Sequence, residues 1–226
     1  SRFETITNGF SGPDFDAESG ELPDAALRGR FVLAHVGSVL TWRGADHVLE
    51  ATRSMMDAAS ADRLAVCFIG HAARLGAEDL QDRGVVRSYG YVSHGEAVTW
   101  MKSSTALLLI NTEWANIPGK LFEYLAAGRP IIAAVREGPT ADLVREHEAG
   151  VVVPPDDPQQ IASAIRGVYE AWEDGRLSSP DRRAIDRYER AELTRRLAGL
   201  FDAVTWSDTA VRASGPGRQP QHGSAK

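Results

Sequence analysis

The chain has 226 residues, of which 43% are hydrophobic and 25% charged, and its net charge at pH 7 is −6. This size and balance are typical of one globular domain with its own core, so an unfolded or fibrous chain is excluded. The negative charge argues against broad binding to nucleic acid or to an anionic membrane, so any phosphate site must be local. No apolar run approaches transmembrane length, and we expect no transmembrane segment.

The single cysteine, Cys67, lies in the apolar run 64–69. A lone cysteine in such a run predicts a core residue in a reducing compartment. We therefore expect a cytoplasmic protein.

Residues 1–30 show little periodicity and are rich in glycine, proline and acidic residues, which predicts a connecting segment. From residue 31 onward, short apolar runs alternate with helical patterns. The predicted strands are 31–37, 64–69, 85–89, 106–110, 130–134 and 150–153. The predicted helices are about 45–59, 93–101, 118–127, 140–147, 158–172 and 179–204.

This alternation predicts right-handed strand–helix–strand units on a parallel sheet. The fold class is therefore α/β, a Rossmann-like three-layer sandwich with a mostly parallel six-stranded sheet over residues 31–204. Two helix starts carry strong signals: Ser93 and Glu96 form a capping box, and Asp157 precedes Pro158. Residues 205–226 turn to serine, glycine, proline and glutamine, which predicts a disordered tail.

The helix that follows the fourth strand carries the strongest functional signal. Pro118 suits its first turn and Gly128 the position just past its end. Ile117, the predicted N-cap, has no side-chain oxygen for the N–H groups of the first turn. Those donors and Lys120 are therefore available to an anion such as a phosphate. Glu123, one turn further, suits the hydroxyls of a sugar, as an acidic residue does for ribose in dinucleotide folds.

Two interpretations of this helix are open. One is half of a nucleotide pocket. The other is a short amphipathic helix on which Lys120 and Glu123 form a solvated pair three positions apart.

Further candidates follow other strands, at the edge where open α/β sheets bind ligands. Gly37 and Ser38 follow the first strand, and Arg43, in the same loop, suits a phosphate. Tyr91 and Val92 follow the third strand and are candidates to meet a base. Each has a plainer interpretation, namely a turn glycine, a surface cation or a packing residue. A nucleotide, however, needs phosphate, ribose and base contacts together, and this edge offers all three.

Other chemistries find no support in the sequence. The first loop lacks G-x-G-x-x-G and the Walker pattern, and neither G-x-S-x-G nor a His/Cys metal spacing is present. We therefore expect neither a cofactor nor a metal. His35 lies inside the first strand, which indicates packing rather than catalysis.

Seven stretches form a recognisable set: 36–38, 43–44, 68–70, 89–92, 117–130, 138–144 and 149–158. With them, residues 31–174 resemble the C-terminal, donor-binding domain of a GT-B-fold glycosyltransferase of the retaining family-four, or group 1, kind. The stretch 117–130 is the most specific of the seven.

The resemblance implies a donor site made of Gly37, Ser38, Arg43, Gly70, Tyr91, Val92, Pro118, Gly119, Lys120, Leu121 and Glu123. In it, Glu123 would hold the donor ribose, and Lys120 with the amides of its turn would face the sugar and its phosphates. Arg43 would meet the diphosphate. The donor would be a UDP-, GDP-, ADP- or TDP-linked sugar, transferred with retention and without a metal.

Two positions depart from the family pattern. Many relatives carry a glutamate eight positions before Glu123, facing the transferred sugar; here that position is Ala115, with Glu113 as an offset substitute. A phosphate-binding arginine common after the first-strand glycine is Ser38 here. These departures concern the contacts to the sugar and to the phosphates.

GT-B enzymes close two Rossmann-like domains around their substrates, and this sequence resembles only one. The resemblance implies an N-terminal acceptor domain as partner, with the acceptor-side catalytic residues in it, so we expect this chain alone to be inactive. Three alternatives stay open: a non-catalytic nucleotide-binding module, a sugar-nucleotide epimerase, and an α/β interaction domain with no nucleotide. The last predicts that Glu123→Ala changes no ligand affinity.

Overall fold

The computed structural model describes residues 3–16, 18, 20–39, 42–56, 62–71, 75–178, 180 and 182–213, and only the backbone of 42, 43, 182, 183 and 205–213. The strands in this part are β1 (Phe31–Val36), β2 (Leu64–Ile69), β3 (Val86–Ser88), β4 (Ala106–Asn111), β5 (Ile131–Val135) and β6 (Gly150–Val153). They form one sheet in the order β3-β2-β1-β4-β5-β6, and every pairing is parallel. The predicted Rossmann-like parallel fold is confirmed.

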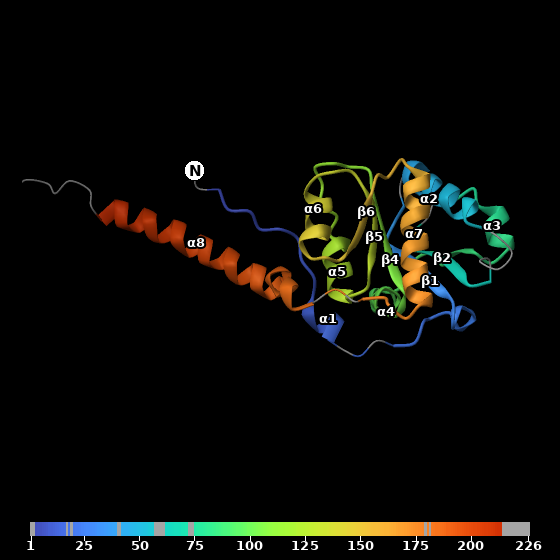
Figure 1. The fold of residues 1–226 in the computed structure, drawn as a ribbon. Coiled ribbons are helices and arrows are strands. Elements are labelled where there is room, and N and C mark those ends of the chain that lie inside the picture. The colour runs from blue at the N-terminus through green and yellow to red at the C-terminus, as the bar shows by residue number, and fades with distance from the viewer. Residues whose placement is uncertain are drawn as a thin grey trace, which may run out of the picture.

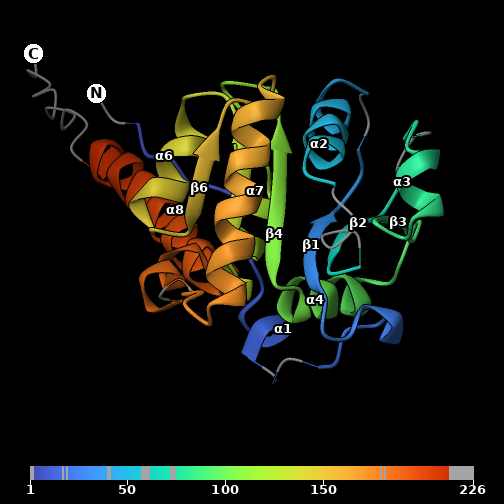
Figure 2. The same ribbon diagram turned by 45° about the vertical axis from the view of Figure 1, so that its right-hand side comes forward.

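Helices cover both faces of this sheet (Figure 1). One face carries α2 (Trp42–Ser54), α3 (Glu78–Asp82) and α7 (Pro158–Glu173). The other carries α4 (His94–Ser103), α5 (Lys120–Ala127) and α6 (Pro139–Glu146). Figure 2 shows α2 and α7 in front of the sheet and the arrowheads of β1, β4 and β6 pointing the same way. Because both faces are covered, β1 and β2 are buried along their whole length, as their continuous apolar sequences predict.

The predicted helix caps are confirmed. Ser93 Oγ accepts a hydrogen bond from the Glu96 amide at 3.2 Å. Asp157 accepts from the backbone amide of Gln160 at 3.0 Å and also from its side chain at 2.7 Å. Gly128 ends α5 in the left-handed conformation, with φ of 65°. These local signals therefore place the starts of α4 and α7 and the end of α5.

The segment 1–30, predicted to be a connection, packs into the domain from Phe10 onward. Phe10, Phe15 of α1 (Gly12–Asp16) and Leu27 of the 3₁₀ helix η1 (Ala25–Leu27) are all buried in the core under α4 and α5. Asp24 links the segment to β3 and the residue after it, because it accepts hydrogen bonds from Arg87 at 2.8 Å and from Tyr89 at 2.6 Å. Isolated apolar residues between glycines and prolines show no period, so the sequence pattern did not reveal this packing.

The buried position of Leu27 leads to a stability prediction. We expect Leu27→Ala to lower the free energy of unfolding by about 2 kcal/mol, because it leaves a cavity in the core. The half-buried Leu22 provides the control, and we expect Leu22→Ala to cost about half as much. Urea unfolding of both variants measures this. Equal, small losses would contradict a structural role for the segment.

The C-terminal region also differs from the prediction. A 3₁₀ helix, η2 (Arg182–Tyr188), precedes α8 (Arg190–Ala213), so the last α-helix starts later than expected and continues past residue 204. The stretch 205–213 contains no glycine or proline, which first appear at Gly215 and Pro216, so nothing in it ends the helix. Residues 214–226 of the predicted tail lie outside the described residues.

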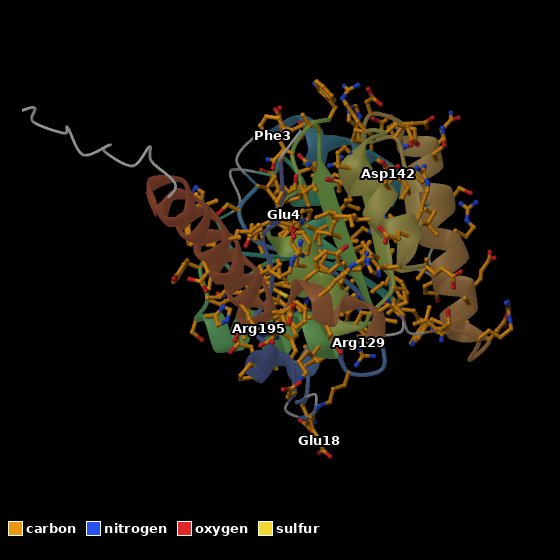
Figure 3. All side chains as sticks on the ribbon, turned by 90° about the vertical axis from the view of Figure 1, so that its left-hand side faces the viewer. Phe3, Glu4, Glu18, Arg129, Asp142 and Arg195 are labelled. Atoms are coloured by element: carbon orange, nitrogen blue, oxygen red, sulfur yellow. The ribbon has the colours of Figure 1, made fainter. Side chains whose placement is uncertain are left out.

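Helix α8 projects away from the rest of the domain (Figure 1). Figure 3 shows Phe3 and Glu4 on the side of the molecule that carries α8, and Arg196 of α8 pairs with Glu4 at 3.0 Å. The side chains of Leu197, Val204 and Phe3 are exposed. Among the described helices, α8 included, none is both long and apolar enough to cross a membrane.

Candidate functional site

The centre of the sheet is where the strand order reverses. β1 lies next to β2 on one side and β4 on the other, so the connections that leave β1 and β4 run to opposite faces. In open α/β sheets this reversal opens a crevice beyond the carboxyl ends of the strands, and ligands bind there. The loops after β1, β2 and β3 and the turn into α5 all lie at this edge, so the structure brings the predicted site segments together.

The first three of these loops stack closely through glycines. The Gly37 amide donates to the Ile69 carbonyl, and the Gly70 amide to the Gly90 carbonyl, both at 2.7 Å. Gly37 and Gly70 have φ of 125° and 124°, which side-chain-bearing residues rarely adopt. A Cβ on Gly70 would lie 2.7 Å from the Gly37 carbonyl oxygen. These glycines are therefore required both by backbone conformation and by the approach of one loop to the next.

The turn into α5 begins two residues later than predicted. Gly119, not Ile117, is the N-cap, because the Leu121 amide bonds to the Pro118 carbonyl at 2.9 Å in a turn that precedes the helix. Gly119 has no side chain to cap the helix. Within the described part of the chain the amides of Gly119 and Lys120 donate no hydrogen bond. The expectation that donors stay available at this helix start is therefore kept, with the cap at a different residue.

Lys120 does not lie free on the surface of α5. Its Nζ donates a hydrogen bond to Nε2 of His35 at 3.2 Å, and Nδ1 of His35 donates to the Leu108 carbonyl at 3.0 Å. A carbonyl only accepts, so Nδ1 carries the ring proton and Nε2 is the acceptor. A Cβ on Gly37 would lie 2.6 Å from Lys120 Nζ. The amine therefore rests against the Gly37 backbone, between the connections that follow β1 and β4.

Burial controls the protonation of both groups. It lowers the pKa of Lys120 to about 8, and the Glu123 carboxylate acts in the opposite direction. Burial, assisted by the charge of Lys120, lowers the pKa of His35 to about 3. At pH 7 the histidine is therefore neutral and the lysine mostly charged, which places a poorly hydrated cation beside free amides.

Glu123 lies one turn after Lys120 and is half-buried. Lys120 bonds to His35 rather than to Glu123, which argues against the interpretation of a solvated pair. The next residue, Tyr124, was not predicted to matter. Its buried hydroxyl accepts from the Val36 amide at 2.7 Å and so fastens α5 to the end of β1. A polar hydroxyl in a helix of buried apolar side chains is the sequence signal that would have found it.

The remaining predicted residues have different surroundings. Ser38 is exposed, and Tyr91 is 92% exposed, so the interpretation of Tyr91 as a packing residue is wrong. Val92 is half-buried against the core, and the side chain of Leu121 is fully buried within it. The side chain of Arg43 lies outside the described residues. Leu121 therefore offers a ligand neither its buried side chain nor its amide, which already donates to Pro118.

The sequence did not indicate two neighbours of the site. One is His35, which was assigned to packing and does pack, but also bonds to Lys120. The other is Asn8, in the segment predicted to be a connection: a Cβ on Gly119 would lie 2.6 Å from its Nδ2. No sequence spacing links residues so far apart in the chain.

The loop between β4 and α5 is held by bonds to its backbone. Arg136 donates to the Thr112 carbonyl at 3.1 Å and Thr140 to the Asn116 carbonyl at 2.8 Å. Glu113, in this loop, lines a cavity of about 460 Å³ at the same edge. Its other lining residues are Asp46, His47, Thr112, Arg136, Pro155 and Asp156. Within the described chain, no three His, Cys, Asp or Glu residues gather as a metal site requires.

The model of the family described as glycosyl transferases group 1 matches residues 30–171. The chain belongs to this family. The structure of Anabaena HepE with UDP is similar, with a TM-score of 0.69 and 17% identity over 88% of this chain and 57% of HepE. Sucrose-phosphate synthase from Thermosynechococcus elongatus has a TM-score of 0.68 and 16% identity over 89% of this chain and 52% of that one. No protein of curated function matches the sequence.

A third structure covers a single domain. It is the C-terminal domain of the group 1 glycosyl transferase LpcC from Francisella tularensis, with a TM-score of 0.58, 16% identity, and coverage of 75% of this chain and 92% of that one. This chain therefore spans little more than half of HepE and of sucrose-phosphate synthase but nearly all of an isolated C-terminal domain. The resemblance to the C-terminal domain of a GT-B glycosyltransferase is confirmed at the level of fold.

Proposed function

We propose that this chain is the donor-binding half of a glycosyltransferase that moves a sugar from a nucleoside diphosphate to an acceptor. The observation that carries the proposal is Lys120. A partly buried lysine is held against the Gly37 backbone at the strand-order reversal, beside two amides that donate to no described residue, in a member of the group 1 family.

In this proposal the donor lies across the carboxyl edge of the sheet. Its diphosphate binds Lys120 and the amides of Gly119 and Lys120, which combine a cation with the positive end of a helix. Glu123 accepts hydrogen bonds from the ribose, and the backbone at Tyr91 lines the base. By resemblance, Arg43 adds a second cation. HepE has been solved with UDP and with UDP-glucose, so a uridine donor is the first to test.

The reaction breaks the bond between the sugar C1 and the diphosphate oxygen, and the electron pair leaves with the diphosphate. The acceptor hydroxyl oxygen forms the new bond to C1 and gives up its proton to a base. This chain contributes the stabilisation of the leaving diphosphate by Lys120 and the helix amides, so the proposed mechanism needs no metal. Retention at C1 is proposed from the family resemblance.

The proposed partner is an N-terminal acceptor domain of the same enzyme, which supplies the base. Two observations support it: this chain spans 57% of HepE, and apolar side chains such as Phe3 and Val204 are exposed on the α8 side. We therefore expect no acceptor-dependent transfer by this chain alone. Transfer measured without a partner domain would contradict this part of the proposal.

Calorimetric titration with UDP, GDP, ADP and TDP tests the donor site. We expect one nucleotide to bind selectively, and we expect Glu123→Ala to weaken it by about 1–2 kcal/mol through the loss of a hydrogen-bond acceptor. Glu170→Ala, at an exposed position on α7 across the sheet, is the control and should leave affinity unchanged. Equal affinities of Glu123→Ala and the parent, or binding of none of the four, would contradict the proposal.

A further inference from the structure

We propose that His35 is a positioning residue that places the Lys120 amine for the donor diphosphate by accepting a hydrogen bond from it. The inference rests on the proposed donor site and adds to it a residue that does not itself touch the ligand.

Burying a histidine at position 35 carries a cost in the free energy of folding. His35 is 1% exposed and lies in β1, all of whose residues are buried between two helical layers. A buried imidazole is tolerated only if its nitrogens are paired, and an apolar side chain would fill the space without that condition. Both nitrogens are paired here, one with Leu108 of the neighbouring strand and one with Lys120. Only the second bond reaches out of the core toward the carboxyl edge.

The hydrogen bond to Leu108 fixes the direction in which His35 accepts. The Leu108 carbonyl fixes the proton on Nδ1, so the lone pair of Nε2 must face Lys120. A lysine has three N–H donors on a flexible stem, and one of them is used here. The other two remain for a ligand, and the amine loses part of its conformational freedom before the ligand arrives. A ligand then meets an ordered cation instead of having to order one.

The neutral imidazole of His35 holds Lys120 without offsetting its charge. Among the side chains that the structure describes, two act on Lys120 from the elements around it, His35 from β1 and Glu123 from α5 itself. An ion pair with Glu123 would hold the amine but would also offset its charge and engage the carboxylate assigned to the ribose. A neutral imidazole holds the amine and leaves its full charge to the diphosphate. This explains why the acceptor is a histidine buried in a strand and not a second carboxylate.

Two amide variants distinguish a role of His35 in positioning Lys120 from a role in packing alone. In His35→Asn the side-chain amide keeps a donor near the place of Nδ1, so it retains the Leu108 bond but does not reach Lys120. In His35→Gln the longer side chain places an oxygen near Nε2 and retains the acceptor for Lys120. We expect His35→Asn to lower the affinity for UDP, or for whichever nucleoside diphosphate binds, about tenfold, as for one lost hydrogen bond. We expect His35→Gln to stay within about threefold of the parent.

A second measurement follows Lys120 without any nucleotide. The ¹³Cε signal of Lys120 reports its titration in the free protein, and the pKa of this amine is about 8 while it is held in the site. In His35→Asn the released amine moves to solvent, so its pKa should rise toward the ordinary value of 10.5. In His35→Gln the pKa should stay low. Urea unfolding of both variants shows whether any loss merely follows stability.

The outcomes distinguish the two proposals. If His35→Gln loses as much affinity as His35→Asn and the Lys120 titration is the same in all three proteins, the positioning role is overturned, although a parent that binds nucleotide still supports the donor site. If the titration shifts only in His35→Asn but the parent binds no nucleoside diphosphate, His35 does hold Lys120 and the donor site is overturned.

Discussion

Lys120→Met is expected to lower the affinity for a nucleoside diphosphate by about 3 kcal/mol, roughly 150-fold. The change removes the only cation whose described side chain lies against the Gly37 backbone, and hydrogen bonds between charged partners in poorly hydrated sites are among the strongest in proteins. Calorimetric titration at pH 7 measures this loss. Lys102→Met is a matched control, because Lys102 is also a buried lysine but bonds to the Phe15 carbonyl in α1, beside α4. It should lower stability and leave affinity unchanged.

The pH dependence of binding follows from the same lysine. Its pKa is about 8 in the free protein, and a bound diphosphate favours the protonated form and so raises it. Affinity is therefore full below pH 8 and falls as the pH rises above 8, by up to about tenfold per unit. His35, with a pKa of about 3, stays neutral throughout this range. Lys120→Met should show no such fall between pH 8 and 9.

Stability should change in the opposite direction. The pKa of Lys120 is about 8 in the folded protein and 10.5 ordinarily, so between these values the unfolded chain binds more protons and stability rises with pH. Below pH 8 the buried charge opposes folding, and Lys120→Met removes it. Lys120→Met also leaves Nε2 of the buried His35 without its hydrogen-bond donor, and this cost offsets the gain. The urea midpoint at pH 7 is therefore expected to change little while the variant loses its ligand. A variant that binds UDP as tightly as the parent would contradict the donor site.

Gly70→Ala is the second change with a large expected effect. The new Cβ would lie 2.7 Å from the Gly37 carbonyl oxygen and 2.8 Å from its carbonyl carbon, so backbone rather than a flexible side chain must move. The φ of 124° adds strain of its own. Overpacking and strain together predict a loss of at least about 3 kcal/mol in the free energy of unfolding. Because the Gly37 backbone, against which Lys120 rests, has to move, nucleotide affinity should also fall by more than about tenfold.

Gly76→Ala is the control that distinguishes backbone strain at a positive φ from a steric clash of the new Cβ. Gly76 also has a positive φ, 62°, but a Cβ there would meet no atom of the described residues within 4 Å. Its loss should be limited to about 1 kcal/mol of backbone strain, without an effect on nucleotide affinity. Urea unfolding and calorimetry of both variants test the pair. Similar stabilities and affinities for the two variants would mean that the stacking of the Gly37 and Gly70 loops is not needed by the fold or the site.

The sequence by itself determined the layers of this protein and most of its local boundaries. The run 64–69 is apolar throughout, and this can be read from its residues alone. Such a run predicts a strand that helices cover on both faces of the sheet, as the structure shows. The Ser93 cap, the Asp157 cap and the Gly128 end depend on hydrogen bonds or conformations within a few residues, so local spacing predicts them. The motif at 117–130 pointed to the family for the same reason, since its residues form one continuous turn and helix.

Only the tertiary structure decided which side chains meet. The bond between His35 and Lys120 exists because β1 and β4 are neighbours in the sheet, and the strand order is set by packing over the whole domain. The burial of Phe10 and Leu27 likewise depends on the surface that α4 and α5 present to them. Contacts of this kind join residues tens of positions apart, and their energies come from burial and paired polar groups that exist only once the layers have assembled.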